Sequence, residues 1–76
     1  MDIKLFVANG CTLCVPVKRF AEELDNVQII NLTDEPDYIK QYNLMSTPSL
    51  VIENDDGTEV IVTPALIMER LRKELN

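Results

Sequence analysis

Two cysteines separated by two residues, Cys11 and Cys14, are the side chains of this chain best suited to chemistry. An ionised thiol is a strong nucleophile, and two thiols three positions apart on one helical turn lie close enough to form a reversible disulfide. The pair can therefore exchange a dithiol for a disulfide. We expect Cys11 to be the more exposed, attacking thiol and Cys14 the deeper thiol that resolves a mixed disulfide.

The chain offers few other uses for this pair. It has no His and no third Cys, so one copy cannot supply the four ligands of a structural zinc site. Four thiolates from two chains holding zinc or an iron–sulfur cluster form one alternative, and two structural thiols form another. A single disulfide is also a poor staple for a secreted mini-protein. We therefore favour redox chemistry, with no metal and no cofactor besides the disulfide itself.

The segments around the cysteines are expected to place them at the start of a helix. Residues 3–8 form a mostly apolar strand, which Asn9-Gly10 ends. Pro16 conflicts with a position well inside the helix that follows, and this conflict eases if the regular helix begins near Leu13, which places Pro16 in its first turn. The free N–H groups and partial positive charge of a helix N-terminus stabilise a thiolate. The apolar face of this helix is formed by Val17, Phe20, Ala21 and Leu24.

Apolar runs and turn residues give the rest of an α/β pattern. Thr33 resembles an N-cap with Pro36 just inside the helix, and Thr63 is expected to cap the last helix. After the first helix we predict a strand at 27–32 and a helix that ends near Tyr42. Strands at 50–52 and 60–62 are joined by a turn at 54–57. The last helix has an inward-facing stripe formed by Pro64, Met68, Leu71 and Leu75. The order is β-α-β-α-β-β-α, with parallel strands in its first part and an antiparallel hairpin at the edge.

Composition limits the class of protein. A length of 76 residues fits one domain, 1–76, and 46% hydrophobic residues suffice for a packed core. The net charge of −6 and the scattered basic residues argue against nucleic-acid binding. No segment is long and apolar enough for a membrane span, and the N-terminus lacks the features of a signal peptide. We therefore expect a cytoplasmic protein.

The ordered combination of Cys-x-x-Cys, Thr47-Pro48 and a β-hairpin with an Asp-Gly turn resembles the thioredoxin/glutaredoxin superfamily. The stretch 42–52, YNLMSTPSLVI, is similar to the thioredoxin segment around its cis-proline. The resemblance implies a minimal thioredoxin fold: a four-stranded mixed sheet with helices on both faces. It also implies that Pro48 follows a cis bond and that the backbone of Thr47 pairs with an extended substrate. Thr47 and Pro48 are therefore the expected substrate-binding residues.

Several positions depart from the family pattern. The dipeptide Thr12-Leu13 between the cysteines is neither Gly-Pro nor Pro-Tyr, and no tryptophan precedes the motif. Ile61-Val62 stands where glutaredoxins have the Gly-Gly that helps bind glutathione. A non-catalytic docking domain is thus a further alternative. We expect a monomeric enzyme that reduces protein or small-molecule disulfides and receives electrons from a reductase or a thiol donor.

Residues outside these motifs are given ordinary structural roles. Lys18, one turn after Cys14, is expected to be an exposed helix charge with only a weak effect on a thiolate. Tyr38 and Tyr42 share one helix face and are expected to pack in the core. The carboxylates of Asp55 and Asp56 suit a turn better than a metal site.

Overall fold

The elements follow the predicted order in a computed structural model, which describes residues 1–75 and the side chains of residues 1–74. Their bounds are β1 (Asp2–Val7), α1 (Cys14–Ala21), β2 (Val27–Asn31), α2 (Asp37–Tyr42), β3 (Ser49–Asn54), β4 (Gly57–Ile61) and α3 (Pro64–Leu75). Each predicted strand and helix is present, with ends that differ by a few residues. None of the described helices is long and apolar enough to cross a membrane.

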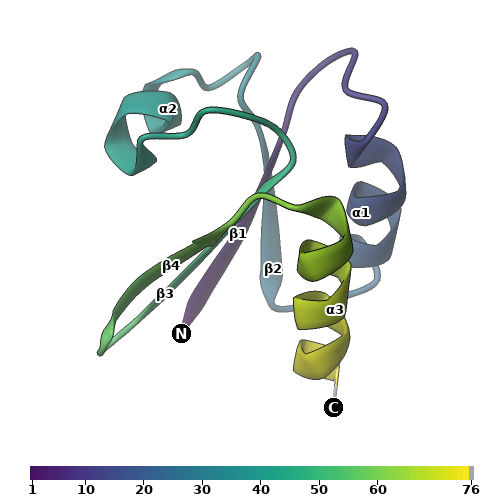
Figure 1. Cartoon of the computed structure of the whole chain (residues 1–76), viewed down its shortest axis with the longest axis vertical. Helices are drawn as coiled ribbons and strands as arrows, with labels where there is room; N and C mark the ends of the chain where they lie inside the picture. The colour runs from purple at the N-terminus through teal and green to yellow at the C-terminus, as the bar shows by residue number, and fades with distance from the viewer. Residues whose placement is uncertain (76) are drawn as a thin grey trace.

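The four strands form one mixed sheet in the order β2-β1-β3-β4. β1 pairs with β2 in parallel and with β3 antiparallel, and β3 pairs with β4 antiparallel. Helices α1 and α3 cover one face of the sheet and α2 lies on the other (Figure 1). The fold class implied by the family resemblance, an α/β mixed sheet with helices on both faces, is therefore confirmed.

The larger core lies between the sheet and the helices α1 and α3. Alternate residues of β1 point into it, as the two-residue period of a strand requires. Its buried members are Ile3, Leu5, Val7, Cys14, Val17, Ala21, Leu24, Leu50, Ile52, Ile67 and Leu71. Cys14 is part of this core, so the packing that holds the fold together also fixes one of the two sulfur atoms.

The residues of α3 that we predicted to face inward are not all among the ones that are most buried. Ile67 and Leu71 are fully buried, whereas Pro64 and Met68 are only partly buried. Ile67 precedes Leu71 by four positions, so these two residues share a helix face, and it is this face that packs on the sheet. The side chain of Leu75, the last predicted member, lies outside the described part of the chain.

A smaller core on the other face of the sheet anchors α2. Phe6 is fully buried, and its ring centroid lies 5.3 Å from that of Tyr38 and 5.6 Å from that of Tyr42. Ile30, Leu32, Leu44 and Val51 complete the cluster. The predicted packing role of the two tyrosines is confirmed. A helix of six residues is too short to be stable alone, so this aromatic cluster holds α2 in place.

The expected start of α2 was wrong. The helix begins at Asp37, with Pro36 preceding it, and residues 32–34 form a turn instead of a first helical turn. The Thr33 hydroxyl oxygen accepts a hydrogen bond from the backbone N–H of Asn9 at 3.0 Å. Thr33 therefore fastens the end of β1 to the turn after β2, and its side chain makes no hydrogen bond that caps α2.

A polar cluster of Lys4, Tyr42 and Glu53 lies next to the aromatic cluster. The Tyr42 hydroxyl donates a hydrogen bond to Glu53 Oε1 at 2.6 Å, and Lys4 Nζ lies 3.3 Å from the same oxygen. Lys4 also pairs with Asp2. The hydrogen bond from Tyr42, followed by that from Lys4, holds the pKa of the Glu53 carboxyl below its usual value.

Replacing the Glu53 carboxylate should therefore change stability in a pH-dependent way. A lowered pKa means that folding favours the charged form, so the stabilisation is complete above the unfolded value of about 4.3 and disappears as pH falls through the folded value. We expect Glu53→Gln to unfold at a lower temperature than the wild type at neutral pH. The difference should narrow as the pH falls below about 4.

Thermal unfolding followed by circular dichroism at several pH values measures this difference. Tyr42→Phe serves as a control, because it removes the donor that contributes most to the lowered pKa. In that background the pH dependence of the Glu53→Gln effect should become weaker. If the difference in unfolding temperature between Glu53→Gln and wild type stayed constant from neutral to acidic pH, the Glu53 charge would contribute nothing to stability.

Candidate active site

The two cysteines lie where β1 ends and α1 begins, as predicted, and are joined by a disulfide. Their Cα atoms are 5.3 Å apart. Cys14 is the first residue of α1 and is only 3% exposed, because it packs into the larger core. Cys11 precedes the helix and is half-buried. The sulfur of Cys11 is thus the more accessible one, and that of Cys14 lies beneath it.

The start of α1 explains how Pro16 is tolerated. Pro16 is the third residue of the helix, so its missing N–H falls in the first turn, as predicted. The N–H groups of Cys14 and Val15 donate to the carbonyl oxygens of Cys11 and Thr12, each at 3.3 Å. Within residues 1–75, the N–H groups of Thr12 and Leu13 make no hydrogen bond. These free donors beside Cys11 favour negative charge there.

Side-chain hydrogen bonds between the ends of the two parallel strands brace the loop before Cys11. Asn31 Nδ2 donates to Asn9 Oδ1 at 2.9 Å, and the Thr33 N–H donates to Asn31 Oδ1 at 2.9 Å. Gly10 follows with φ of 76°, a left-handed conformation that favours glycine. The sequence patterns did not lead us to predict these contacts. The signal was present, since polar residues follow both parallel strands at the edge where their carboxyl ends meet.

The loop before β3 completes the site. The Thr47–Pro48 peptide bond is cis, Pro48 is buried and Thr47 is half-buried. The Ser49 hydroxyl donates to the carbonyl oxygen of Ser46 at 2.6 Å and so fixes the loop. Thr47 shares a shallow hollow with Cys11 and its neighbours Ala8, Asn9, Gly10, Thr12 and Leu13. The fold therefore brings together Cys11 and Thr47, which are 36 positions apart in sequence.

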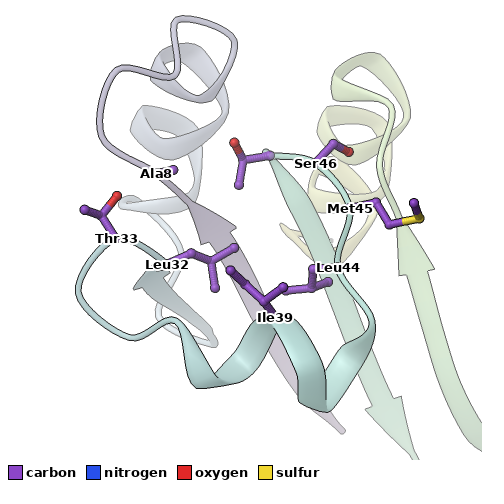
Figure 2. Close-up of a pocket in the computed structure, with 8 residues that line it drawn as sticks. Ala8, Leu32, Thr33, Ile39, Leu44, Met45 and Ser46 are labelled. Atoms are coloured by element: carbon purple, nitrogen blue, oxygen red, sulfur yellow. The ribbon is translucent and has the colours of Figure 1, made fainter.

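Two further cavities flank this hollow. One, of about 310 Å³, faces α2 and is mostly apolar, and Met45 is among its lining residues. Figure 2 shows the side chains of Leu32, Ile39 and Leu44 close together, whereas that of Met45 points away from them. Met45 is 90% exposed, so it contributes little to the core. The other, of about 300 Å³, lies on the α1 side and is lined by both cysteines, Asn31 and Lys18.

The described residues contain no group of three or more Cys, His, Asp or Glu side chains that could hold a metal ion. The described part of the candidate site comprises the disulfide, the Thr47–Pro48 loop and the residues that line the adjoining hollows.

Comparison with known proteins identifies the family. No protein-family model matches the sequence. A thioredoxin of Methanocaldococcus jannaschii is 30% identical to this chain over 82 aligned positions, which cover 99% of this chain and 96% of that protein. The chain belongs to the thioredoxin family. The match spans nearly the full length of both proteins, so it covers the positions of the cysteine pair and the Thr47–Pro48 loop in this chain.

Solved structures agree with this assignment. A mutant of the thioredoxin-like protein BC3987 is 26% identical, with coverage of 99% of this chain and 100% of that one and a TM-score of 0.66. Thioredoxin 1 of Thermosipho africanus is 18% identical, with coverage of 99% and 94% and a TM-score of 0.68. The oxidised thioredoxin of Plasmodium falciparum is 15% identical, with coverage of 96% and 79% and a TM-score of 0.72. The last two show that this thioredoxin-family chain shares their fold.

Proposed function

We propose that residues 1–76 act as one thiol–disulfide oxidoreductase domain that reduces the disulfides of proteins or small molecules. The observation that carries this proposal is the asymmetry of the cysteine pair. Cys11 is half-buried beside free backbone donors and the Thr47 loop, while Cys14 is 3% exposed. An accessible thiol can reach a substrate, and a buried neighbour can displace that substrate once it is bound.

Reduction of a substrate then takes two exchange steps. The Cys11 thiolate attacks one sulfur of the substrate disulfide, which forms a mixed disulfide and releases the other substrate sulfur as a thiolate. The Cys14 thiolate next attacks the Cys11 sulfur, which closes the Cys11–Cys14 disulfide and releases the second substrate thiolate. Two electrons pass from the protein to the substrate. A reductase or a thiol donor must return them.

Thr47 is proposed to hold the substrate beside Cys11. Within residues 1–75 the backbone N–H and C=O of Thr47 make no hydrogen bond, although the residue shares a hollow with Cys11. Free backbone groups beside a reactive sulfur suit an extended peptide, which would pair with them as an added strand. Such pairing depends on the substrate backbone and selects little for its side chains. Pro48 is proposed to shape this loop.

The domain is proposed to work as a monomer in the cytoplasm. Reduction of disulfides suits a compartment whose thiol pool is kept reduced. The disulfide within the described chain closes between two residues of one copy, so the exchange reaction needs no second copy.

Cys14→Ser tests the division of roles between the two cysteines. This variant can form the mixed disulfide but cannot resolve it, so incubation with a disulfide substrate should yield a stable covalent adduct at Cys11. Mass spectrometry without reductant would detect the adduct, and Cys11→Ser serves as the matched control. An equal or larger adduct on Cys14 in the control would reverse the proposed roles. If neither variant formed an adduct, the oxidoreductase function would be rejected.

A further inference from the structure

Lys18 lies in the cavity that both cysteines line on the α1 side of the disulfide. It follows Cys14 by four positions in α1, so the two side chains occupy the same face of the helix, one turn apart. Lys18 is exposed, as predicted. It nevertheless lines the same cavity as Cys11 and Cys14.

Lys18 is also the one charged side chain among the described residues that line the cavities at the disulfide. The ends of β1 and β2 contribute Val7, Ala8, Asn9 and Asn31, and the segment around the cysteines and the Thr47 loop contribute only neutral side chains. The charged residues of α3 that line a cavity, Glu69, Arg70 and Lys73, border a separate one beside Glu59 and Ile61. Among the residues that the structure describes, no carboxylate lines the cavities at the disulfide, and the sequence contains no histidine that could assist a thiol there.

A positive charge near Cys14 would favour the resolving step. Cys14 must lose its proton before it can attack, yet it is packed among apolar side chains, and a thiol in such surroundings is hard to ionise. A cation within the same cavity offsets this cost, because an opposite charge nearby favours the thiolate.

We propose that the Lys18 ammonium is a positioning residue for resolution, stabilising the Cys14 thiolate as it attacks the mixed disulfide at Cys11. The inference rests on the proposed function. The Cys14 proton leaves to solvent, the Cys11–Cys14 bond forms, and the bond between Cys11 and the substrate sulfur breaks. That substrate sulfur departs as a thiolate with the bonding electron pair.

Stopped-flow release of thionitrobenzoate separates the two exchange steps. The reduced protein is mixed with one equivalent of 5,5′-dithiobis(2-nitrobenzoate); attack by Cys11 releases the first thionitrobenzoate and attack by Cys14 releases the second. Lys18→Met should slow the second release about 2- to 5-fold at a given pH below the thiol pKa, as expected for a partly solvated charge. The rate at high pH, where the thiol is fully ionised, should be unchanged.

Two variants distinguish a charge effect from a structural one. Lys18→Arg keeps the charge and should retain the wild-type pH profile. Arg19→Met removes the adjacent exposed charge of α1, which does not line the cavity, and should also leave the profile unchanged. High salt should reduce the difference between Lys18→Met and wild type, because it screens exposed charges.

The possible results distinguish a failure of the proposed role of Lys18 from a failure of the proposed oxidoreductase function. A wild-type protein that never releases the second thionitrobenzoate would overturn the proposed function itself. A wild type that releases both, with a Lys18→Met profile equal to that of wild type or of Arg19→Met, would overturn the role of Lys18 alone. A lower rate at every pH, high pH included, would indicate a structural effect and would also count against the proposal.

Discussion

Cys11→Ser should lose disulfide-reducing activity by roughly 1,000-fold or more, since loss of the nucleophile leaves the covalent pathway without its first step. Serine is nearly the same size as cysteine, but its hydroxyl is not appreciably ionised at neutral pH. Cys11 is half-buried and lies outside the regular helix, so the fold should tolerate the change. Turnover of insulin disulfides, with dithiothreitol as the electron donor, measures the effect.

The fold of this variant must be verified separately. Its far-ultraviolet circular dichroism should match that of the wild type after treatment with reductant, because neither protein then contains the disulfide. Thr58→Ala, a substitution of an exposed residue of β4 that lines neither cavity at the disulfide, serves as an activity control and should retain most of the turnover. Undiminished activity in Cys11→Ser would mean that another group attacks the substrate.

Phe6→Ala should cost about 3–5 kcal/mol of stability, the usual range for removal of a buried aromatic side chain. Phe6 is fully buried and contacts both tyrosine rings of α2. Without it, the six-residue helix loses its main anchor to the sheet. Small domains are typically stable by only about 5–15 kcal/mol, so this loss should leave a marginally folded protein.

Urea unfolding followed by circular dichroism measures this change. The matched control is Val60→Ala in β4, where the valine is 44% exposed and lies outside both cores. Removal of a surface side chain of this kind should alter stability by no more than about 1 kcal/mol. Similar losses in the two variants would show that the aromatic cluster is not the anchor of α2.

The order of elements and the position of the cysteine pair were predictable because both depend on local sequence. Apolar runs mark β1 and β2, Asn9-Gly10 marks the end of a strand, and Pro16 limits where α1 can begin. These signals act within a few residues, so they can be recognised without knowledge of the folded chain.

Features that depend on distant contacts were not predictable in the same way. The local sequence around Thr33 suits an N-cap, but the Thr33 hydroxyl oxygen instead accepts a hydrogen bond from the backbone N–H of Asn9, 24 positions earlier. Ile67 is buried because of where α3 crosses the sheet, which its own helical pattern did not reveal. The location of Lys18 in the cysteine-lined cavity likewise emerged only when β1, β2 and α1 were placed together.

The most direct test of the proposed function is the reduction potential of the Cys11–Cys14 pair, measured by equilibration in buffers with defined ratios of reduced to oxidised glutathione or of reduced to oxidised dithiothreitol. We predict a reversible two-electron transition in the range of known Cys-x-x-Cys proteins, roughly −270 to −120 mV, and near its reducing end for a cytoplasmic reductant. A value near −120 mV would reverse the proposed direction of electron flow. The absence of any reversible transition would contradict the oxidoreductase function.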